Sequence, residues 1–499
     1  MNKIDMFDAE LEEVDYDEQN LLTLVKRSFI ENKFLEAGKY LQKLIRDYPA
    51  KPEYYSALAI VWKNVGSIAE AEENYLKAID LNPGLWEAYY NLGILYHENR
   101  KVDSAIECYK KSINLKPDFY LSHYNLGNAF RETLKLDEAV GCYEKAVELK
   151  KNYSEAHYNL GVVRELLNNF DSALGCYNRA IQYDPNHVNA HWNKSLLLLT
   201  SGNLIEGFKE YEWRMKRKEF TQRNFVCPPL TDQDISNKKI IVYAEQGFGD
   251  AIQFIRYMPM LKSKGCNVTL ACDSILLDLF KNVSGIDKVV LEDEALKKQN
   301  DYDFNISLLS LPYYFRTAAE TIPSYIPYVK VAKNKTEEWK KIIGRDNNFK
   351  IGLVWGGNPK HGKDDERSIP LCDFSILSSI NNIKLFSLQK GKPLEQIENC
   401  KFNIENLSSL GEISFVDTAA IIENLDLVIS VDTSVAHLAG AMGKPVWTLL
   451  PYYSDWRWLK DRNDSPWYPA MKLFRQPEPG RWDVVLNNVK QELIKLCLR

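Results

Sequence analysis

The sequence predicts a multidomain protein of class α + α/β, in which a helical repeat solenoid is followed by two α/β lobes. Two observations carry this prediction. A 34-residue period runs from about residue 18 to 218, and a fixed period of this length is typical of stacked helix pairs. From Lys238 onward, short β-branched strands alternate with glycine turns and amphipathic helices. That alternation is the pattern of parallel sheets covered by helices.

Composition sets limits on the class of protein. The chain has 499 residues, 45% hydrophobic and 26% charged, which is enough for about three globular domains. A net charge of −5 provides no general attraction to nucleic acid or to an anionic membrane. No apolar run has the length of a membrane span, and the acidic tail of residues 1–17 lacks a signal core. Nine cysteines without a C-x-x-C pair favour a reducing compartment, so we expect a cytoplasmic protein.

The repeat array is defined by several positions that recur together. Small residues return in register, tyrosines follow four residues later, and glycines or small replacements stand where the two helices of a unit should cross. The small residues are Ala37, Ala71, Ala105, Ala139, Ala173 and Gly207, the tyrosines are Tyr75, Tyr109, Tyr143, Tyr177 and Tyr211, and the crossing positions are Ala59, Gly93, Gly127, Gly161 and Ser195. This pattern resembles the tetratricopeptide repeat family, with about six units over residues 18–218. Such units stack into a superhelix with a concave groove.

Four asparagines share one position on the first helix of their units: Asn91, Asn125, Asn159 and Asn193. The resemblance implies that this position faces the groove, and the array is similar to the asparagine ladder of O-GlcNAc transferase. Because an amide offers a donor and an acceptor, such a ladder can hold an extended peptide. Asparagine is also common there in ordinary repeats, so both interpretations stay open. Cysteines and histidines at the same period are predicted to be repeat positions rather than metal ligands.

The second half follows a polar, proline-containing linker at residues 219–237. The first lobe is expected at 238–335, with a strand at 240–244 and a helix that Gly265 ends. The second lobe is expected at 349–499, including a C-terminal helix. Its clearest unit is a buried strand, Leu427–Val431, then a helix with Thr433 and Ser434 as caps and Gly443 at its end. Two Rossmann-like lobes of this kind are the GT-B arrangement of glycosyltransferases.

Two turns at strand ends are the candidate site. In EQGFGDAIQF, Gly247 and Gly249 allow a tight turn and Asp250 opens a helix. In the second lobe, Asp432 to His437 follow a buried strand, where free backbone N–H groups can hold a phosphate. This pair resembles the heptosyltransferase family, whose first lobe has a GD turn and whose second has a DT-x-x-x-HL-x-x-A signature. The resemblance covers residues 238–499.

The resemblance implies roles for these residues. Asp250 matches the base that deprotonates the acceptor hydroxyl, so that a nucleoside diphosphate leaves with inversion. Asp432 matches the acid that holds the donor, and Arg367 matches a basic residue that pairs with the diphosphate. The other donor-binding positions are Gly247, Gly249, Gly356, Lys363, Gln389, Thr433, Ser434 and His437. Ser434 replaces a glycine usual in many heptosyltransferases.

Two further patterns have competing interpretations. Asp301 and Asp303 form a D-x-D, which holds Mn²⁺ in other glycosyltransferases, but Asp303 directly precedes a strand and is predicted to be a strand-entry residue. We therefore expect no metal and no cofactor. Trp456 and Trp458 lie in an aromatic segment that either stacks on a sugar or fixes a loop to the core.

The leading hypothesis is an inverting glycosyltransferase that moves a sugar from a nucleotide-sugar to a macromolecular, most simply protein, acceptor in the groove. One alternative is a surface-glycan or lipopolysaccharide transferase whose array serves assembly. Another is a non-catalytic scaffold with a degenerate nucleotide-sugar-binding domain. The presence of Asp250, Arg367 and Asp432 together favours the enzyme. The sequence leaves open the sugar, the nucleotide, the acceptor and whether copies of the chain associate.

Overall fold

The computed structural model describes residues 17–221, 223, 225–245, 247–360, 362 and 364–497. The predicted acidic tail, except Asp17, and Lys363 lie outside these residues. The chain divides into two compact units between Asn193 and Lys194. No helix in the described part of the chain is long and apolar enough to cross a membrane.

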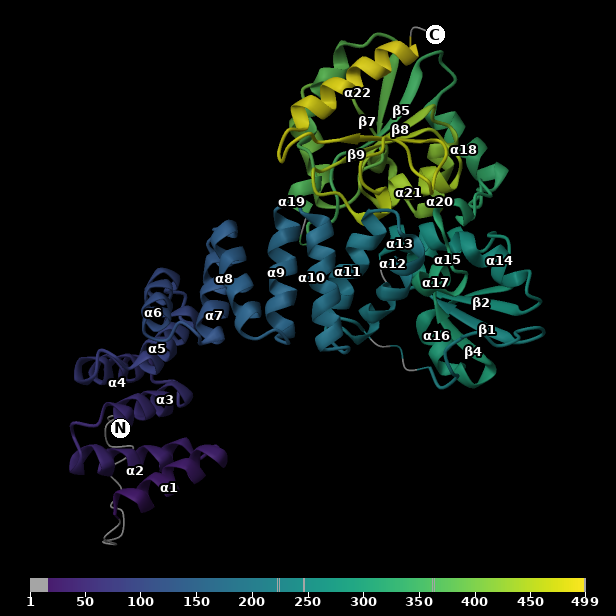
Figure 1. The fold of residues 1–499 in the computed structure, drawn as a ribbon. Helices are drawn as coiled ribbons and strands as arrows, with labels where there is room; N and C mark the ends of the chain where they lie inside the picture. The colour runs from purple at the N-terminus through teal and green to yellow at the C-terminus, as the bar shows by residue number, and fades with distance from the viewer. Residues whose placement is uncertain are drawn as a thin grey trace. The chain divides into compact units, whose positions relative to one another are not determined.

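The first unit is an array of consecutive antiparallel helix pairs (Figure 1). Its helices are α1 (Glu18–Ile30), α2 (Phe34–Asp47), α3 (Pro52–Asn64), α4 (Ile68–Leu81), α5 (Trp86–Glu98), α6 (Val102–Leu115), α7 (Tyr120–Glu132), α8 (Leu136–Leu149), α9 (Ser154–Leu166) and α10 (Phe170–Tyr183). The helix α11 (Val188–Thr200) spans the division between the units. The predicted helical solenoid is confirmed.

The packing inside each pair explains the period. A Cβ atom on Gly93 would lie 2.6 Å from the ring of Tyr109, and one on Gly161 would lie 2.6 Å from the ring of Tyr177. These tyrosines are almost completely buried. The glycine of the first helix therefore makes room for the tyrosine of the second, as the crossing position predicted.

The second unit begins with the end of the repeats, α12 (Leu204–Tyr211) and the 3₁₀ helix η2 (Glu212–Lys216). Arg214 in η2 is 1% exposed. Its Nη2 lies 2.6 Å from Oε1 of Glu245, just beyond the first strand of the next lobe, and its Nη1 lies 2.6 Å from Oε1 of Glu212. Nη2 also donates to the hydroxyl of Ser310 at 2.8 Å. The end of the repeats is thus fixed to the α/β half by a buried ion pair.

The first lobe has a parallel sheet in the order β3-β2-β1-β4. Its elements are β1 (Lys239–Tyr243), α13 (Phe248–Phe254), η3 (Ile255–Tyr257), α14 (Met258–Lys262), β2 (Asn267–Cys272), α15 (Ser274–Phe280), β3 (Lys288–Leu291), α16 (Glu292–Lys297), η4 (Gln299–Asp301), β4 (Phe304–Ser307), η5 (Leu308–Ser310), α17 (Leu311–Tyr314) and η6 (Ala319–Thr321). The single helix predicted up to Gly265 is wrong. It starts earlier, at Phe248, and is interrupted because Pro259 has no N–H to continue the ladder.

The second lobe has a parallel sheet in the order β10-β9-β8-β5-β6-β7. Its elements are α18 (Lys333–Ile343), β5 (Phe349–Val354), α19 (Asp364–Arg367), η7 (Leu371–Ser379), β6 (Ile383–Ser387), η8 (Lys392–Asn399), β7 (Glu405–Asn406), η9 (Leu407–Leu410), α20 (Phe415–Glu423), β8 (Leu427–Val431), α21 (Ser434–Ala441), β9 (Val446–Leu450), η10 (Trp456–Trp458), β10 (Met471–Arg475) and α22 (Trp482–Cys497). The helix α22 packs on η7 and β10 of this lobe.

The strand β8 is buried at every position, as its β-branched run predicts. Gly443 has φ +72° and follows the end of α21, so it terminates the helix as expected. One expectation is wrong: Thr433 is the N-cap residue, but its side chain makes no capping hydrogen bond. Its hydroxyl lies 3.0 Å from that of Ser430, which leaves the first backbone N–H groups of α21 without a side-chain cap.

Candidate active site

The two predicted turns meet where α13 packs against α21. A Cβ atom on Gly249 would lie 2.9 Å from Cδ2 of His437 and 3.7 Å from Cα of Ser434. A side chain at position 249 would therefore separate the two helices. Gly247 is the N-cap of α13 and has open space around it. The sequence thus placed the two turns correctly at one location.

Asp250 forms an ion pair that the sequence did not predict. Its Oδ1 lies 2.5 Å from Nη2 of Arg457, which belongs to η10 of the second lobe, and the two side chains are 17% and 10% exposed. Arg457 also contacts Asp455 at 2.8 Å. Burial raises the pKa of Asp250, and the nearby Asp455 and Glu245 add to this rise, whereas Arg457 opposes it. Asp250 is therefore a desolvated carboxylate held in place by an arginine.

Asp432 and His437 lie beside this pair. Asp432 follows β8, and its Oδ1 is 4.0 Å from Nε2 of His437. Burial, together with Asp455, raises the pKa of Asp432 to about 6, although Arg367 and Arg457 favour its charged form. Burial, reinforced by the positive charge of Arg457, lowers the pKa of His437 to about 3. His437 is therefore neutral at physiological pH.

The imidazole of His437 is fixed by aromatic neighbours. Its Nδ1 lies 2.9 Å from the hydroxyl of Tyr468, and its ring stacks on Trp458 with centroids 5.1 Å apart. Trp456 and Trp458 are 4% and 0% exposed, and Trp456 packs on Phe208. The two tryptophans therefore fix the loop to the core and have no face available for a sugar.

Arg367 lies next to the start of α21. Its Nη1 donates to the backbone carbonyl of Asp432 at 3.2 Å, and its Nε lies 3.1 Å from Asp364. Thr433 and Ser434, at the start of α21, are half-buried. A guanidinium and uncapped N–H groups thus share one location, which favours a negatively charged group there.

Gln389 and Gly356 shape the neighbouring loop after β5. Gln389 is 3% exposed, and its Oε1 accepts from the backbone N–H groups of Trp355 at 3.0 Å and Gly356 at 2.9 Å. Its Nε2 donates to the carbonyl of Gly356 at 2.9 Å. A Cβ atom on Gly356 would lie 2.9 Å from Pro393. The amide of Gln389 is thus used to hold the loop.

A cavity of about 380 Å³ lies at the carboxyl ends of β1, β2 and β3. Phe248 and Ala251, on either side of Asp250 in α13, contribute to its lining, together with Glu245, Ser274 and Arg223. This is the sheet edge at which α/β folds bind ligands. The cavity therefore lies beside the helix that carries Asp250, and Asp250 itself is not part of its lining.

Asp303 accepts a hydrogen bond from the backbone N–H of Lys239 at 2.8 Å. The predicted strand-entry role is confirmed. Within the described residues, no three His, Cys, Asp or Glu side chains are grouped as a metal site. That the chain needs no metal remains a prediction.

Three of the four asparagines of the array donate to tyrosine hydroxyls. Asn91, Asn125 and Asn193 are half-buried and Asn159 is 6% exposed. The amide of Asn125 donates to the hydroxyl of Tyr90 at 3.2 Å, and that of Asn159 donates to the hydroxyl of Tyr124 at 2.9 Å. Asn193 makes the same kind of bond to Tyr177 at 3.3 Å. Tyrosine hydroxyls of earlier helices therefore accept a hydrogen bond from three of these amides, and peptide binding by the asparagines remains a prediction.

Comparison with known proteins agrees with this architecture. Models of the tetratricopeptide repeat match residues 86–119 and 154–187, and a second repeat model matches 64–99 and 128–167. The model of glycosyltransferase family 9 (heptosyltransferase) matches residues 375–478. The chain joins tetratricopeptide repeats to a heptosyltransferase-family domain. The match to this domain includes Gln389, Asp432, His437 and Arg457, whereas Asp250 and Arg367 lie outside it.

Individual relatives are more distant. Protein FlbA of Caulobacter vibrioides is 22% identical over 325 residues, which are 60% of this chain and 54% of that protein. This chain thus spans about half the length of that relative. The solved structure of YrrB, described as a TPR protein with an unusual peptide-binding site, is 22% identical with a TM-score of 0.33 and covers 36% of this chain and 93% of its own. PilF of Pseudomonas aeruginosa is 18% identical with a TM-score of 0.36, covering 40% and 91%.

Proposed function

We propose that the chain is an inverting glycosyltransferase of the GT-B type, which transfers a sugar from a nucleotide-sugar to a macromolecular acceptor, most simply a protein. The observation that carries the proposal is the contact of Gly249 with His437 and Ser434. It brings the candidate base, Asp250, to the strand-end turn of the heptosyltransferase-family domain. A nucleophilic hydroxyl and a donor diphosphate need to meet at such a place.

In this proposal the donor diphosphate lies at the start of α21. The uncapped N–H groups near Ser434 and the guanidinium of Arg367 stabilise the charge that develops on the leaving group. Asp432 orients the donor through its carboxylate. Because these groups supply the charge stabilisation, the proposed transfer proceeds without a divalent metal, and activity should persist in EDTA.

The acceptor hydroxyl enters from the cavity beside α13. Asp250 removes its proton as the oxygen attacks the anomeric carbon, and the bond from that carbon to the diphosphate oxygen breaks. The burial that raises the pKa of Asp250 makes it a stronger base, and Arg457 keeps it ionised. Direct attack from the opposite side inverts the configuration.

The repeats suggest interaction with a protein, and we propose that the acceptor is held in the groove of the array. A thermal-shift series of the full chain with ADP-, GDP-, UDP- and CMP-linked sugars tests the donor, since a ligand that binds only the folded state raises the melting temperature. At a concentration of about 100 Kd, the added stability is about 2.7 kcal/mol. Failure of all four nucleotide classes to bind would exclude the transferase. Binding without turnover would point to a scaffold.

A further inference from the structure

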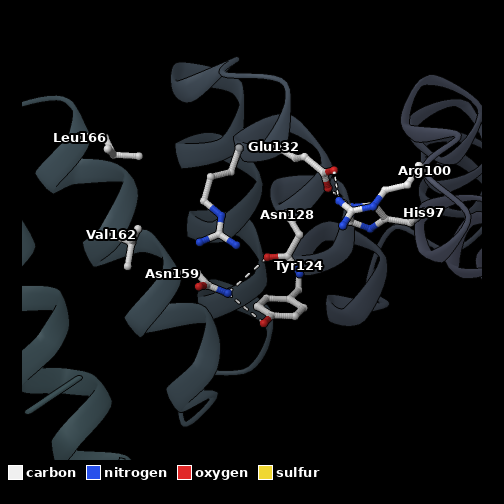
Figure 2. A pocket seen from close by; sticks show the side chains of 9 residues that line it. His97, Arg100, Tyr124, Asn128, Glu132, Asn159, Val162 and Leu166 are labelled. Carbon is white, nitrogen blue, oxygen red and sulfur yellow. Dashed lines mark hydrogen bonds and ion pairs between the residues drawn. The ribbon is translucent and has the colours of Figure 1, made fainter. Parts of the chain in front are cut away.

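A second cavity, of about 580 Å³, lies in the repeat array. Residues from α5, α7 and α9 and from the turn after α5 line it (Figure 2). The residues that line this cavity all belong to the first unit and are distant in sequence from those of the candidate active site. Its polar groups fall into two sets, which differ in what they leave available for a ligand.

In the first set, the carboxylate of Glu132 is already paired with other side chains of the lining. Glu132 lies 2.8 Å from Nε2 of His97 and 3.1 Å from Nη1 of Arg100, as the dashed lines in Figure 2 show. The hydrogen bond from His97, with the contribution of Arg100, lowers the pKa of Glu132. The one carboxylate of the lining is therefore ionised and already has two partners, His97 and Arg100.

The second set presents donors. Asn128 Oδ1 accepts from Asn159 Nδ2 at 3.2 Å and from the hydroxyl of Tyr143 at 2.7 Å, and the amide of Asn128 also contacts the hydroxyl of Tyr124. The hydroxyl of Tyr124 accepts from Asn159 and keeps its own hydrogen. The hydroxyl hydrogen of Tyr124 is thus a donor that a ligand in the cavity can use.

Arg131 completes this donor set. It lines the cavity and is half-buried, and within the described residues its guanidinium has no hydrogen bond or ion pair. The arginine is not a repeat position, because His97 stands 34 residues before it and Glu165 stands 34 residues after it. The cavity therefore contains a cation that pairs with none of the described residues.

We propose that this cavity binds the carboxylate side chain of an aspartate or glutamate in an extended polypeptide segment. Arg131 forms the ion pair, and the hydroxyl of Tyr124 donates a further hydrogen bond. Val162 and Leu166 provide an apolar surface on the α9 side (Figure 2) for the methylene groups and backbone of the segment. The inference rests on the proposed function only where it takes this segment to be part of the acceptor.

Selection of a displayed random dodecapeptide library on the full chain tests the proposal. Acidic residues should be enriched on the parent and on Arg179→Gln, an exposed arginine of α10 outside the cavity. The enrichment should be lost on Arg131→Gln. In fluorescence anisotropy, a selected peptide should bind Arg131→Gln about tenfold more weakly, in line with the loss of a charge-assisted hydrogen bond. Arg131→Lys should retain part of the affinity.

Leu166→Glu is a second variant that does not depend on removal of Arg131. Leu166 is 48% exposed, so the fold should tolerate the change, and the added carboxylate should repel the acidic peptide. Absence of acidic enrichment on the parent, or binding to Arg131→Gln and Leu166→Glu as tight as to the parent, overturns the proposal. The selection uses no donor. If the peptide selection fails but the donor still binds, the proposed carboxylate site is wrong and the proposed transferase activity is not affected. If the donor does not bind but acidic peptides are selected, the transferase proposal is wrong and the carboxylate site is supported.

Discussion

The guanidinium of Arg457 lies 2.5 Å from the carboxylate of Asp250, although 207 positions separate the two residues in the sequence. An ion pair therefore links α13 of the first lobe to η10 of the second. The arginine affects both the position and the basicity of the candidate base.

Asp250→Asn should lower the rate of transfer by about a hundredfold to ten-thousandfold, the range for loss of a general base. Donor affinity should be nearly unchanged, because the candidate donor groups lie on α19 and α21. Release of nucleoside diphosphate in the presence of acceptor, together with donor calorimetry, measures both. Asp278→Asn, a surface residue paired with Lys281, is the control. Near-normal turnover of Asp250→Asn would remove it as the base.

Arg457→Gln should move the acid limb of the pH profile of kcat/KM to higher pH. Arg457 opposes the rise in the pKa of Asp250, so its loss raises that pKa further, and the base is then ionised only at higher pH. Arg457→Lys, which keeps the charge, should move the limb less. Arg462→Gln, an exposed arginine paired with Asp464, should not move it. A profile that is the same in all four proteins contradicts a positioning role for Arg457.

Arg367→Ala should weaken donor binding by about 1.5–3 kcal/mol, the contribution of a hydrogen bond to a charged group. Besides the lost contact to the diphosphate, the variant loses the bond from Arg367 to the carbonyl of Asp432. Isothermal titration with the donor identified by thermal shift measures the effect. Arg345→Ala removes an exposed arginine of the same lobe and should bind like the parent. Equal affinity of both variants would place the diphosphate elsewhere.

Asp432→Asn should change how stability depends on pH. The folded-state pKa of about 6 exceeds that of an unfolded aspartate, so between about pH 4 and 6 the folded protein binds more protons at this site. The parent therefore loses stability as the pH rises through this window, by up to about 3 kcal/mol, and the asparagine variant does not lose this contribution. The melting temperature of the variant relative to the parent should increase from pH 4 to pH 7. A constant difference would contradict the raised pKa.

Gly249→Ala should destabilise the second unit by about 1–3 kcal/mol, the usual cost of overpacking. The added Cβ would lie 2.9 Å from His437, whose ring cannot move because Tyr468 and Trp458 hold it. Gly247→Ala is the matched control, since a Cβ there meets no atom within 4 Å. Circular dichroism should show a lower melting temperature for Gly249→Ala alone. Equal melting temperatures would mean that α13 and α21 do not pack closely in solution.

Local sequence predicted the parts of the fold that local interactions determine. The strand β8 has the expected limits because it is a buried apolar run that a turn residue follows. The helix after β1 was not predicted correctly, since Pro259 was given too little weight. The two turns of the candidate site were found because glycine and strand-end aspartate are local signals.

The side-chain contacts around the candidate site could not be predicted from local sequence signals. The pairing of Arg457 with Asp250 depends on the packing of the two lobes, although an arginine between two tryptophans was an available indication of a buried charge. Of the four asparagines assigned to the groove, Asn159 lines the cavity of the array, and a peptide-binding role for the set stays a prediction. Their bonds to tyrosines of earlier helices join residues 35 positions apart in two of the three cases, and local patterns do not reveal a contact between residues so far apart.

The ion pair between Arg214 and Glu245 determines where the chain can be divided into fragments that fold. A fragment that starts after the linker, at Lys238, would fold Glu245 into the first lobe without the arginine that neutralises it. A buried charge that loses its partner costs about 3–5 kcal/mol, which is a large part of the stability of an ordinary domain. The last repeat helices therefore belong to the folding unit of the α/β half. Repeat arrays from other proteins would have to be joined ahead of α12 for that half to keep its own structure.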